Sequence, residues 1–460
     1  LNFYLPITTG GELPYNDSKA YPQGTSMRPV LLLLIFTIVA MVCLTTYDEP
    51  LSPQSRQMIE HLEQQRSQNG EPYYYLLGID APVADTIIEK GKKLSQSDIK
   101  RDNNLYTQAA SKEATLPFPP TGHLLHCDIV RDDDCLARLL RRSDSFQPHI
   151  EQYQAVLQRY QRFLEYSEFH SVMGYQVDSV YPNYAFLISA NQLLQLKALQ
   201  AALEHSPQYG LSILLPDFER LRFHLSQSDS LLHTMVFSVM LHRDLALAAY
   251  LLEQGAQLEE PIAPLTASEF SLANVLTNEF GMVYQLVEQG AYSDNYSALL
   301  GSDSSSRYQD IVVGIGFKPN MTLNDTAANY HNLRTIAEQP SAAFAQNHDI
   351  DSSKPIWRQI VNYIGYVLAE VAKPDLIQYM ARLHDLNTKI ALVNYLNDPS
   401  RTPFNPYYPD ERPRVPPTGK WCQSGPFEDV QQLRCIMRYP PDHLTSTIKA
   451  QQASTSAELR

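Results

Sequence analysis

An uninterrupted apolar segment, from Val30 to Thr46, constrains the fold of this chain more than any other sequence feature. It contains no charged residue and consists mostly of Leu, Ile, Val, Met, Phe and Ala. As an α-helix rising about 1.5 Å per residue it would be roughly 25 Å long, near the lower limit for crossing the hydrocarbon core of a bilayer. Residues 30–46 are therefore predicted to contact the lipid bilayer, within a transmembrane signal-anchor that spans residues 27–47.

The charges that flank this segment predict its orientation. Arg28 lies just before it, whereas Asp48 and Glu49 lie just after it. Because basic residues favour the cytoplasmic side of a membrane, the short N-terminal side is expected in the cytoplasm and the rest of the chain outside it.

Two alternatives to an uncleaved anchor stay open. A cleaved signal peptide has a shorter apolar region, of about 7–15 residues, and a small-residue cleavage site, and no such A-x-A-like site follows here. A lipoprotein would use Cys43, but Val42 stands before it where a small residue is expected. The sequence favours the uncleaved anchor.

The two ends of the chain are expected to lack fixed structure. Residues 1–26 are rich in turn-forming residues and show no sustained hydrophobic periodicity. Because Met27 and Arg28 would make a conventional start of a signal-anchor, we expect residues 1–26 to be a short disordered tail or an over-extended reading frame. The polar residues 446–460 are expected to form a flexible tail.

The remaining residues, 48–445, are predicted to form an ordered exported domain. The chain is 44% hydrophobic and 19% charged, which is typical of a folded domain and excludes both a disordered chain and a multi-pass membrane protein. Its formal net charge of −14 argues against nucleic acid as a partner, because phosphate binding requires clustered Lys and Arg.

Hydrophobic periodicity predicts a mainly α fold. Apolar residues recur at spacings of three and four over His149–Phe169 and Tyr184–Glu204, and again after a capping Asp229 or Ser230 up to Gly255. Residues 398–421 contain seven prolines and are expected to be extended over the domain surface. The predicted architecture is an N-terminal transmembrane helix, an irregular helical exported domain and a Pro-rich C-terminal segment.

Four of the five cysteines form two local pairs. Cys127 lies eight residues before Cys135, and Cys422 lies thirteen residues before Cys435. Paired cysteines after an export segment predict two disulfides in an oxidising compartment, although four buried free thiols would fit the same pattern.

Catalytic signatures are missing from the sequence. We find no G-x-S-x-G, no H-E-x-x-H, no P-loop and no S-x-x-K with its companion motifs, so no catalytic residue and no cofactor is assigned.

One segment resembles a metal site. His123, His126 and Cys127 are followed by the run Asp132–Asp134 and by Cys135, and imidazole, thiolate and carboxylate groups can all bind Zn²⁺. However, a disulfide would consume both thiols, and the Asp run lacks the spacing of an EF-hand. A disulfide-closed surface loop with solvated acids is favoured, and no metal ligand is assigned.

Two similar segments suggest an internal repeat. Leu251–Ala256 and Leu286–Ala291 are similar and are offset by 35 residues, close to the ankyrin period of about 33. No T-P-L-H-type turn precedes either copy, so two helices that end alike are the favoured explanation.

Four stretches, at residues 73–85, 127–140, 231–254 and 318–330, resemble a family of uncharacterised single-anchor, helix-rich exported proteins of Gram-negative bacteria. The likeness extends from Glu71 to Cys435. It implies a single-pass inner-membrane protein with its C-terminal domain in the periplasm, and it implies no activity, ligand or functional residue.

The favoured function is therefore that of a non-catalytic interaction or scaffold protein of the cell envelope, with other envelope proteins as partners. One alternative is an envelope hydrolase or glycan-acting enzyme that uses His123, His126 and Asp132–Asp134. The other is an ankyrin-like helical binding module.

Overall fold

The computed structural model describes residues 27–65, 70–95, 115–120, 123, 125–171, 180–292, 316–347, 354–371, 376–401, 403–411, 414–440 and 443. Within these residues the chain is mainly helical, which confirms the predicted fold class at this level. The predicted tails, 1–26 and 446–460, lie wholly outside the described residues. The chain divides into two units, Leu1–Tyr47 and Asp48–Arg460.

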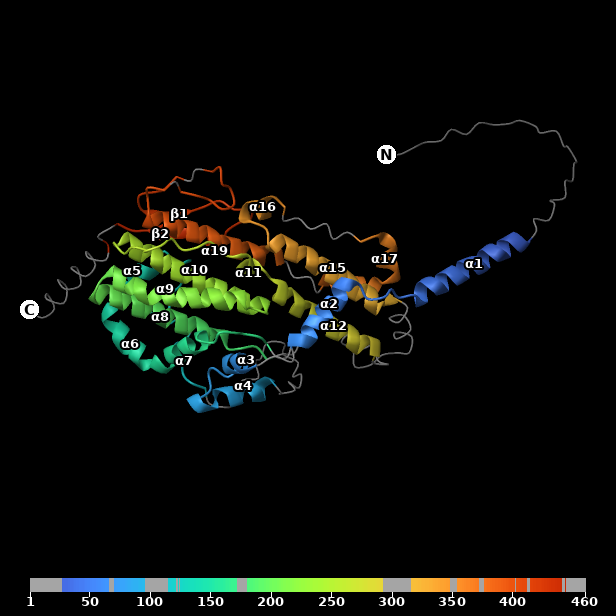
Figure 1. Ribbon diagram of the computed structural model, residues 1–460, viewed down its shortest axis with the longest axis horizontal. Coiled ribbons are helices and arrows are strands. Elements are labelled where there is room, and N and C mark those ends of the chain that lie inside the picture. Colours follow the sequence, from blue (N-terminus) through green and yellow to red (C-terminus); the bar gives the residue numbers. More distant parts are fainter. Residues whose placement is uncertain are drawn as a thin grey trace, which may run out of the picture. The chain divides into compact units, whose positions relative to one another are not determined.

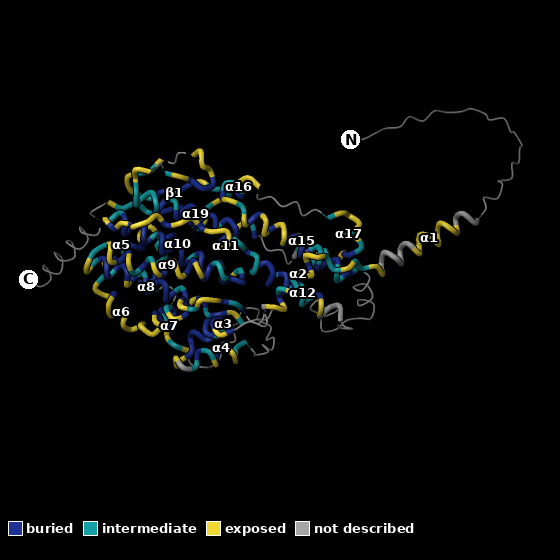
Figure 2. Tube along the Cα trace, viewed as in Figure 1, coloured by how far each residue is buried: buried dark blue, intermediate teal, exposed yellow. Residues whose placement is uncertain are grey.

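The described part of the first unit is helix α1, Met27–Thr46. It begins three residues before the predicted apolar segment and includes Pro29, which the first turn of a helix tolerates because its missing N–H has no intrahelical partner there. Its 20 residues give a length of about 30 Å. The described side chains from Leu31 to Val39 are exposed (Figure 2).

The second unit is built around three consecutive long helices that pack against one another: α8 (Tyr184–Glu204), α9 (Pro207–Ser226) and α10 (Leu231–Glu253). Helix α19 (Leu376–Asn397) packs on α10 (Figure 1). Among the residues searched, α10 is long and apolar enough to cross a membrane, but 89% of its apolar window is buried inside the unit. A helix that is apolar on all sides and so enclosed is a core helix.

Local sequence signals start and stop these helices as expected. The side chains of Asn183, Ser206 and Ser230 each accept a hydrogen bond from the backbone N–H three residues later. Gly255, with φ of 101°, follows the end of α10 and adopts the left-handed conformation that glycine favours. The predicted helix Tyr184–Glu204 is confirmed, and of the two predicted caps, Asp229 or Ser230, the structure has Ser230.

The predicted helix His149–Phe169 is wrong in its bounds. The structure instead has α6 (Phe146–Gln152) and α7 (Gln154–Leu164), separated at Tyr153, where φ is −111° and ψ is 22°. Both helices still bury apolar side chains on either side of the break. A spacing of three and four between apolar residues continues across such a break, so the sequence pattern does not reveal it.

Further helices complete the second unit, and α2, α12 and α15 pack together within it. Their bounds are α2 Pro53–Gln65, α3 Glu71–Leu77, α4 Ile87–Ser95, α5 Cys135–Leu140, α11 Ala267–Phe270, α12 Ala273–Tyr292, α15 Pro319–Ala337, α16 Ser341–Gln346, α17 Ile356–Val361 and α18 Tyr363–Val371, with two 3-10 turns at Ala84–Thr86 and Ser143–Ser145.

A two-stranded antiparallel sheet follows the Pro-rich segment. Strand β1 (Gly419–Cys422) pairs with β2 (Cys435–Arg438), so that Cys422 lies opposite Cys435. The sheet is not predicted from the sequence, because strands of four residues are too short to show an alternating pattern.

Both predicted cysteine pairs lie at disulfide-bonding distance. The S–S distance is 1.94 Å for Cys127 and Cys135, and 2.07 Å for Cys422 and Cys435. The pairing prediction is therefore confirmed at the level of geometry.

The two similar segments, Leu251–Ala256 and Leu286–Ala291, occupy different structural positions. Gln254 and Gly255 follow the end of α10, whereas Gln289 and Gly290 lie within α12. The similar sequences therefore do not form equivalent helix ends.

A buried ion pair ties α9 to α11. The guanidinium of Arg222 donates from Nη2 to Glu269 Oε2 at 2.9 Å, and also to the backbone oxygens of Ala263 and Pro264. Glu269 in turn accepts from the backbone N–H of Thr266 at 2.7 Å. Both charges are thus paired inside the unit, where removal of one partner is costly.

We expect Glu269→Gln to lower the free energy of unfolding by about 3 kcal/mol, because it leaves the Arg222 charge buried and uncompensated. The matched control is Glu165→Gln, at the exposed pair of Glu165 and Arg162, which we expect to leave the free energy of unfolding almost unchanged because water screens exposed charges. Urea denaturation followed by circular dichroism measures both. Equal costs for the two variants would contradict the importance of the buried pair.

A second buried charge lies between α10 and α19. Lys389 is fully buried, and its Nζ donates to the backbone oxygen of His242 at 3.5 Å. Burial lowers the pKa of Lys389 to about 7 from its usual 10.5, against the smaller opposing attraction of Asp429 and Asp128.

This pKa predicts a pH-dependent stability. Between about pH 7 and 10 the unfolded chain binds a proton at Lys389 that the folded chain does not, so the free energy of unfolding rises with pH in that window. We expect Lys389→Met to be more stable than the natural chain at pH 7, and this gain to shrink as the pH rises toward 10. Denaturant titrations across this range test it, with the exposed Lys197→Met as the control. Parallel pH profiles for the natural chain and Lys389→Met would refute the expectation.

Candidate metal centre

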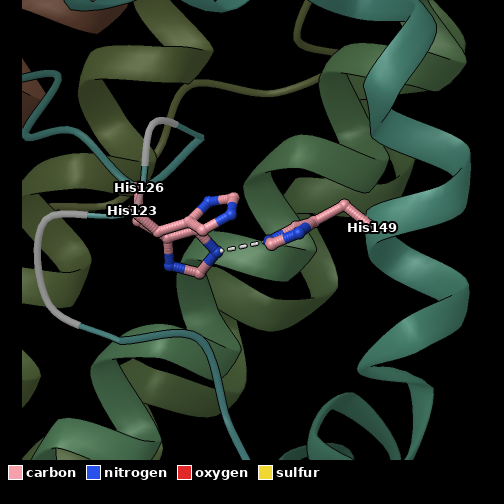
Figure 3. A group of neighbouring side chains, drawn as sticks. All are labelled: His123, His126 and His149. Atoms are coloured by element: carbon pink, nitrogen blue, oxygen red, sulfur yellow. Dashed lines mark hydrogen bonds between the residues drawn. The ribbon is translucent and has the colours of Figure 1, made fainter.

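Three histidine side chains converge in the second unit. His123 and His126 lie in the loop before α5, and His149 projects from α6 toward them (Figure 3). One ring nitrogen from each lies within 4.8 Å of the others. His126 Nε2 is 3.0 Å from His149 Nε2, and the rings of His123 and His149 are stacked with centroids 4.4 Å apart.

Local bonds hold the loop in the conformation that brings its two histidines together. The backbone N–H of His126 donates to the backbone oxygen of His123 at 2.8 Å, which closes a turn. The backbone N–H of Leu125 donates to His123 Nδ1 at 3.2 Å, so the neutral ring carries its proton on Nε2, and His123 would bind an ion through Nε2 only after this hydrogen bond is broken and the proton moves to Nδ1. The link between Cys127 and Cys135 joins the end of this turn to the start of α5.

A glutamine on α8 determines the proton position on His126. Gln192 Nε2 donates to the backbone oxygen of Cys127 at 3.2 Å, which identifies Oε1 as the atom 3.0 Å from His126 Nδ1. Because an amide oxygen only accepts, His126 carries its proton on Nδ1 and a lone pair on Nε2. This arrangement, with an outer hydrogen bond fixing the ring that faces the ion, is characteristic of metal-binding histidines.

The electrostatic surroundings keep two of the rings neutral. Burial lowers the pKa of His126 to about 4, and the neighbouring His149 contributes in the same direction. Burial, followed by repulsion from His123, lowers the pKa of His149 to about 4. Neutral imidazole is the form that binds a metal, so no proton has to be displaced from a cation at neutral pH.

The spacing suits a transition-metal ion. In a tetrahedral zinc site with Zn–N distances of about 2.0–2.1 Å, two ligand nitrogens lie about 3.3 Å apart. The nitrogens of His126 and His149, 3.0 Å apart, are near this separation, and a ring nitrogen of His123 lies within 4.8 Å of both. When His149 binds the ion, its proton sits on Nδ1. Three protein ligands leave a fourth coordination position for water or another group.

The cavity beside this group is small. Leu125, Cys127 and Gln192, which flank or bind His126, line a cavity of about 20 Å³ together with apolar side chains of α5 and α8. Such a volume holds about one water molecule, whereas a small-molecule site typically measures about 300–1,000 Å³.

The structure assembles only part of the group considered in the sequence. His123 and His126 do come together, but Asp132 pairs with Arg138 and Asp133 with Lys420, away from the imidazoles. The backbone N–H of Asp134 donates to Asp132. Cys127 and Cys135 lie at bonding distance from each other and so are not thiolate ligands.

His149 is the residue that sequence reasoning missed. It lies 23 residues after His126, at the start of the predicted helix His149–Phe169. No spacing rule links a loop histidine to a helix histidine at that distance. The link comes from tertiary packing, because α6 packs against α8, the helix that carries Gln192.

A comparison of this chain with protein-family models, with curated proteins and with solved structures found no match. The functional inference therefore rests on the geometry of the chain itself.

Proposed function

We propose that this chain is a membrane-anchored protein of the cell envelope whose helical unit binds a divalent transition-metal ion, Zn²⁺ foremost, through His123, His126 and His149. The observation that carries this proposal is the convergence of three imidazoles, one of which has its lone pair directed by Gln192. Imidazole groups bind Zn²⁺, Cu²⁺ and Ni²⁺ well, and a site without thiolates has no preference for softer ions.

The role that we propose for the ion is structural, within a non-catalytic interaction protein. An ion at this point would join the loop before α5 to α6, and Gln192 would extend the connection to α8. The cavity beside His126, which none of the three histidines lines, has space for about one water molecule. Other envelope proteins are the proposed partners, and the open coordination position is a place where one could contribute a ligand.

A metal-dependent envelope hydrolase is the second candidate. The number of protein ligands favours it, because catalytic zinc sites often have three, whereas structural zinc sites usually have four. Zinc-dependent hydrolysis of an ester or glycan substrate that is lost in His126→Ala would favour the hydrolase over the structural role.

The proposed location is the inner membrane, with a single span and the helical unit in the periplasm. Helix α1 is about 30 Å long and its described apolar side chains are exposed, as those of a lipid-facing helix would be. Two cysteine pairs at bonding distance are in keeping with an oxidising compartment.

Metal binding is tested with the full chain purified in detergent, stripped with a chelator and titrated with Zn²⁺ by calorimetry. We expect one Zn²⁺ per chain at this site, with affinity lowered at least about 100-fold by His126→Ala or His149→Ala and about 10–100-fold by Gln192→Ala. His205→Ala, at an exposed histidine, is the matched control and should bind normally. Unchanged binding in the His126 and His149 variants would refute the site.

Membrane anchoring is tested by alkaline carbonate extraction of membranes from cells that express the full chain. We expect the natural chain to stay in the membrane, and Leu34→Arg to weaken insertion because a central arginine costs about 3 kcal/mol. Val430→Arg, at an exposed position in the helical unit, should have no effect. Membrane retention after deletion of residues 30–46 would contradict the proposed anchor.

A further inference from the structure

The region of α17 and the start of α18 presents a row of exposed apolar side chains in the helical unit. Ile356 is 74% exposed, Trp357 53%, Ile360 70% and Tyr363 63%. Each of the six residues of α17 is exposed or half-buried (Figure 2). A contiguous apolar surface of this kind marks a place where a protein meets a membrane or another protein.

This row is held in a defined orientation by polar contacts on the same segment. Arg358 donates to both carboxylate oxygens of Glu49, at 2.9 and 2.8 Å, and to Asp325 at 3.0 Å. Asn362, which is 1% exposed, accepts from the backbone N–H of Lys318 at 2.8 Å. These contacts fix the backbone of α17. The apolar side chains are therefore exposed because the folded structure holds them there, and not because the segment is loose.

The chain itself connects this surface to the end of α1. Asp48 accepts hydrogen bonds from the backbone N–H groups of Asn320 and Met321 at the start of α15, at 2.8 and 3.0 Å. Asp48 follows Thr46, the last residue of α1, by two residues, which span at most about 7 Å. Whatever the direction of α1, the point where the chain leaves it is therefore close to Asp48, and the next residue, Glu49, binds α17.

We propose that α17 and the start of α18 lie in the headgroup region of the membrane that holds α1, with Ile356, Trp357, Ile360 and Tyr363 inserted into it. This inference rests on the anchor in the proposed function. If α1 spans the hydrocarbon core, its end lies at the bilayer surface, and the headgroup region extends about 5–7 Å beyond it. That thickness matches the reach of the chain from Thr46 to Asp48.

The composition of the surface fits a bilayer interface. Trp and Tyr are enriched at headgroup level, because their rings are apolar and their N–H and O–H groups can meet water. Lys354 and Arg358 are paired with Asp325, so the attraction comes from the apolar side chains and not from net charge. Apolar faces of interfacial helices enter the boundary by about 5–10 Å, which is the depth of such side chains.

This contact would orient the helical unit on the membrane. Figure 1 shows α5 and α6, which border the candidate metal centre, at the end of the helical unit opposite to α17. With α17 on the bilayer, the metal centre faces away from it, toward the periplasm. A second point of attachment also prevents rotation about the anchor.

Tryptophan fluorescence tests this inference, because the chain has only two tryptophans and Trp421 is 2% exposed. The full chain is reconstituted into phosphatidylethanolamine–phosphatidylglycerol vesicles that carry a spin label either near the headgroup or deep in the acyl chain. We expect the headgroup label to quench emission more strongly than the deep label, and this quenching to be lost in Trp357→Phe. The double variant Ile356→Ser, Ile360→Ser should reduce the quenching without changing the denaturation midpoint, because both residues are exposed.

A further variant separates this inference from the anchor. Phe36→Trp in a Trp357→Phe background places the reporter in α1, where we expect the deep label to quench it. If Phe36→Trp is quenched but Trp357 responds only to aqueous iodide, the anchor stands and the surface contact is refuted. If neither tryptophan is quenched by lipid, both are refuted. Trp357 shielded from iodide and lipid alike would indicate a protein contact and would also overturn the inference.

Discussion

The burial of α10 is the constraint on which the rest of the helical unit depends. Most of this helix is enclosed, so the charged side chains at its centre need partners inside the protein. Asp244 accepts from Asn191 and Gln195 of α8, at 3.1 and 2.8 Å, and Asn191 also lies 3.4 Å from Asp217 of α9. Burial raises the pKa of both carboxyl groups, that of Asp217 to about 7. A protonated carboxyl carries no charge, so this polar layer joins three helices with less buried charge than two carboxylates would bring.

The same helix also positions the candidate metal centre. Arg243, next to Asp244, donates to Asp128 at 3.0 Å, and Asp128 lies two residues after His126. Gln192, one residue after Asn191, binds both His126 and the backbone of Cys127. The loop that carries two of the three imidazoles is thus fixed by the polar layer of the core, and its geometry does not depend on a surface contact.

The proposed membrane contact and the proposed metal site lie at opposite ends of the helical unit (Figure 1). At α15 and α17, Asp48 and Glu49 are held to the helical unit by hydrogen bonds and an ion pair, close to where the proposed anchor joins it. At the other end, near α6, the three histidines offer a site for an ion that would hold local structure together.

Some of this was determined by the sequence alone, because the interactions involved are local. The bounds of α8, the Ser230 cap, the stop at Gly255 and the pairing of nearby cysteines all follow from residues close together in the chain. Only the tertiary structure decided the rest. His149 joins the loop histidines through the packing of α6 on α8, and α10 is a core helix because its neighbours enclose it, although its composition would also suit a membrane. Composition sets how much apolar surface a helix has, but what covers that surface depends on residues far away in the sequence.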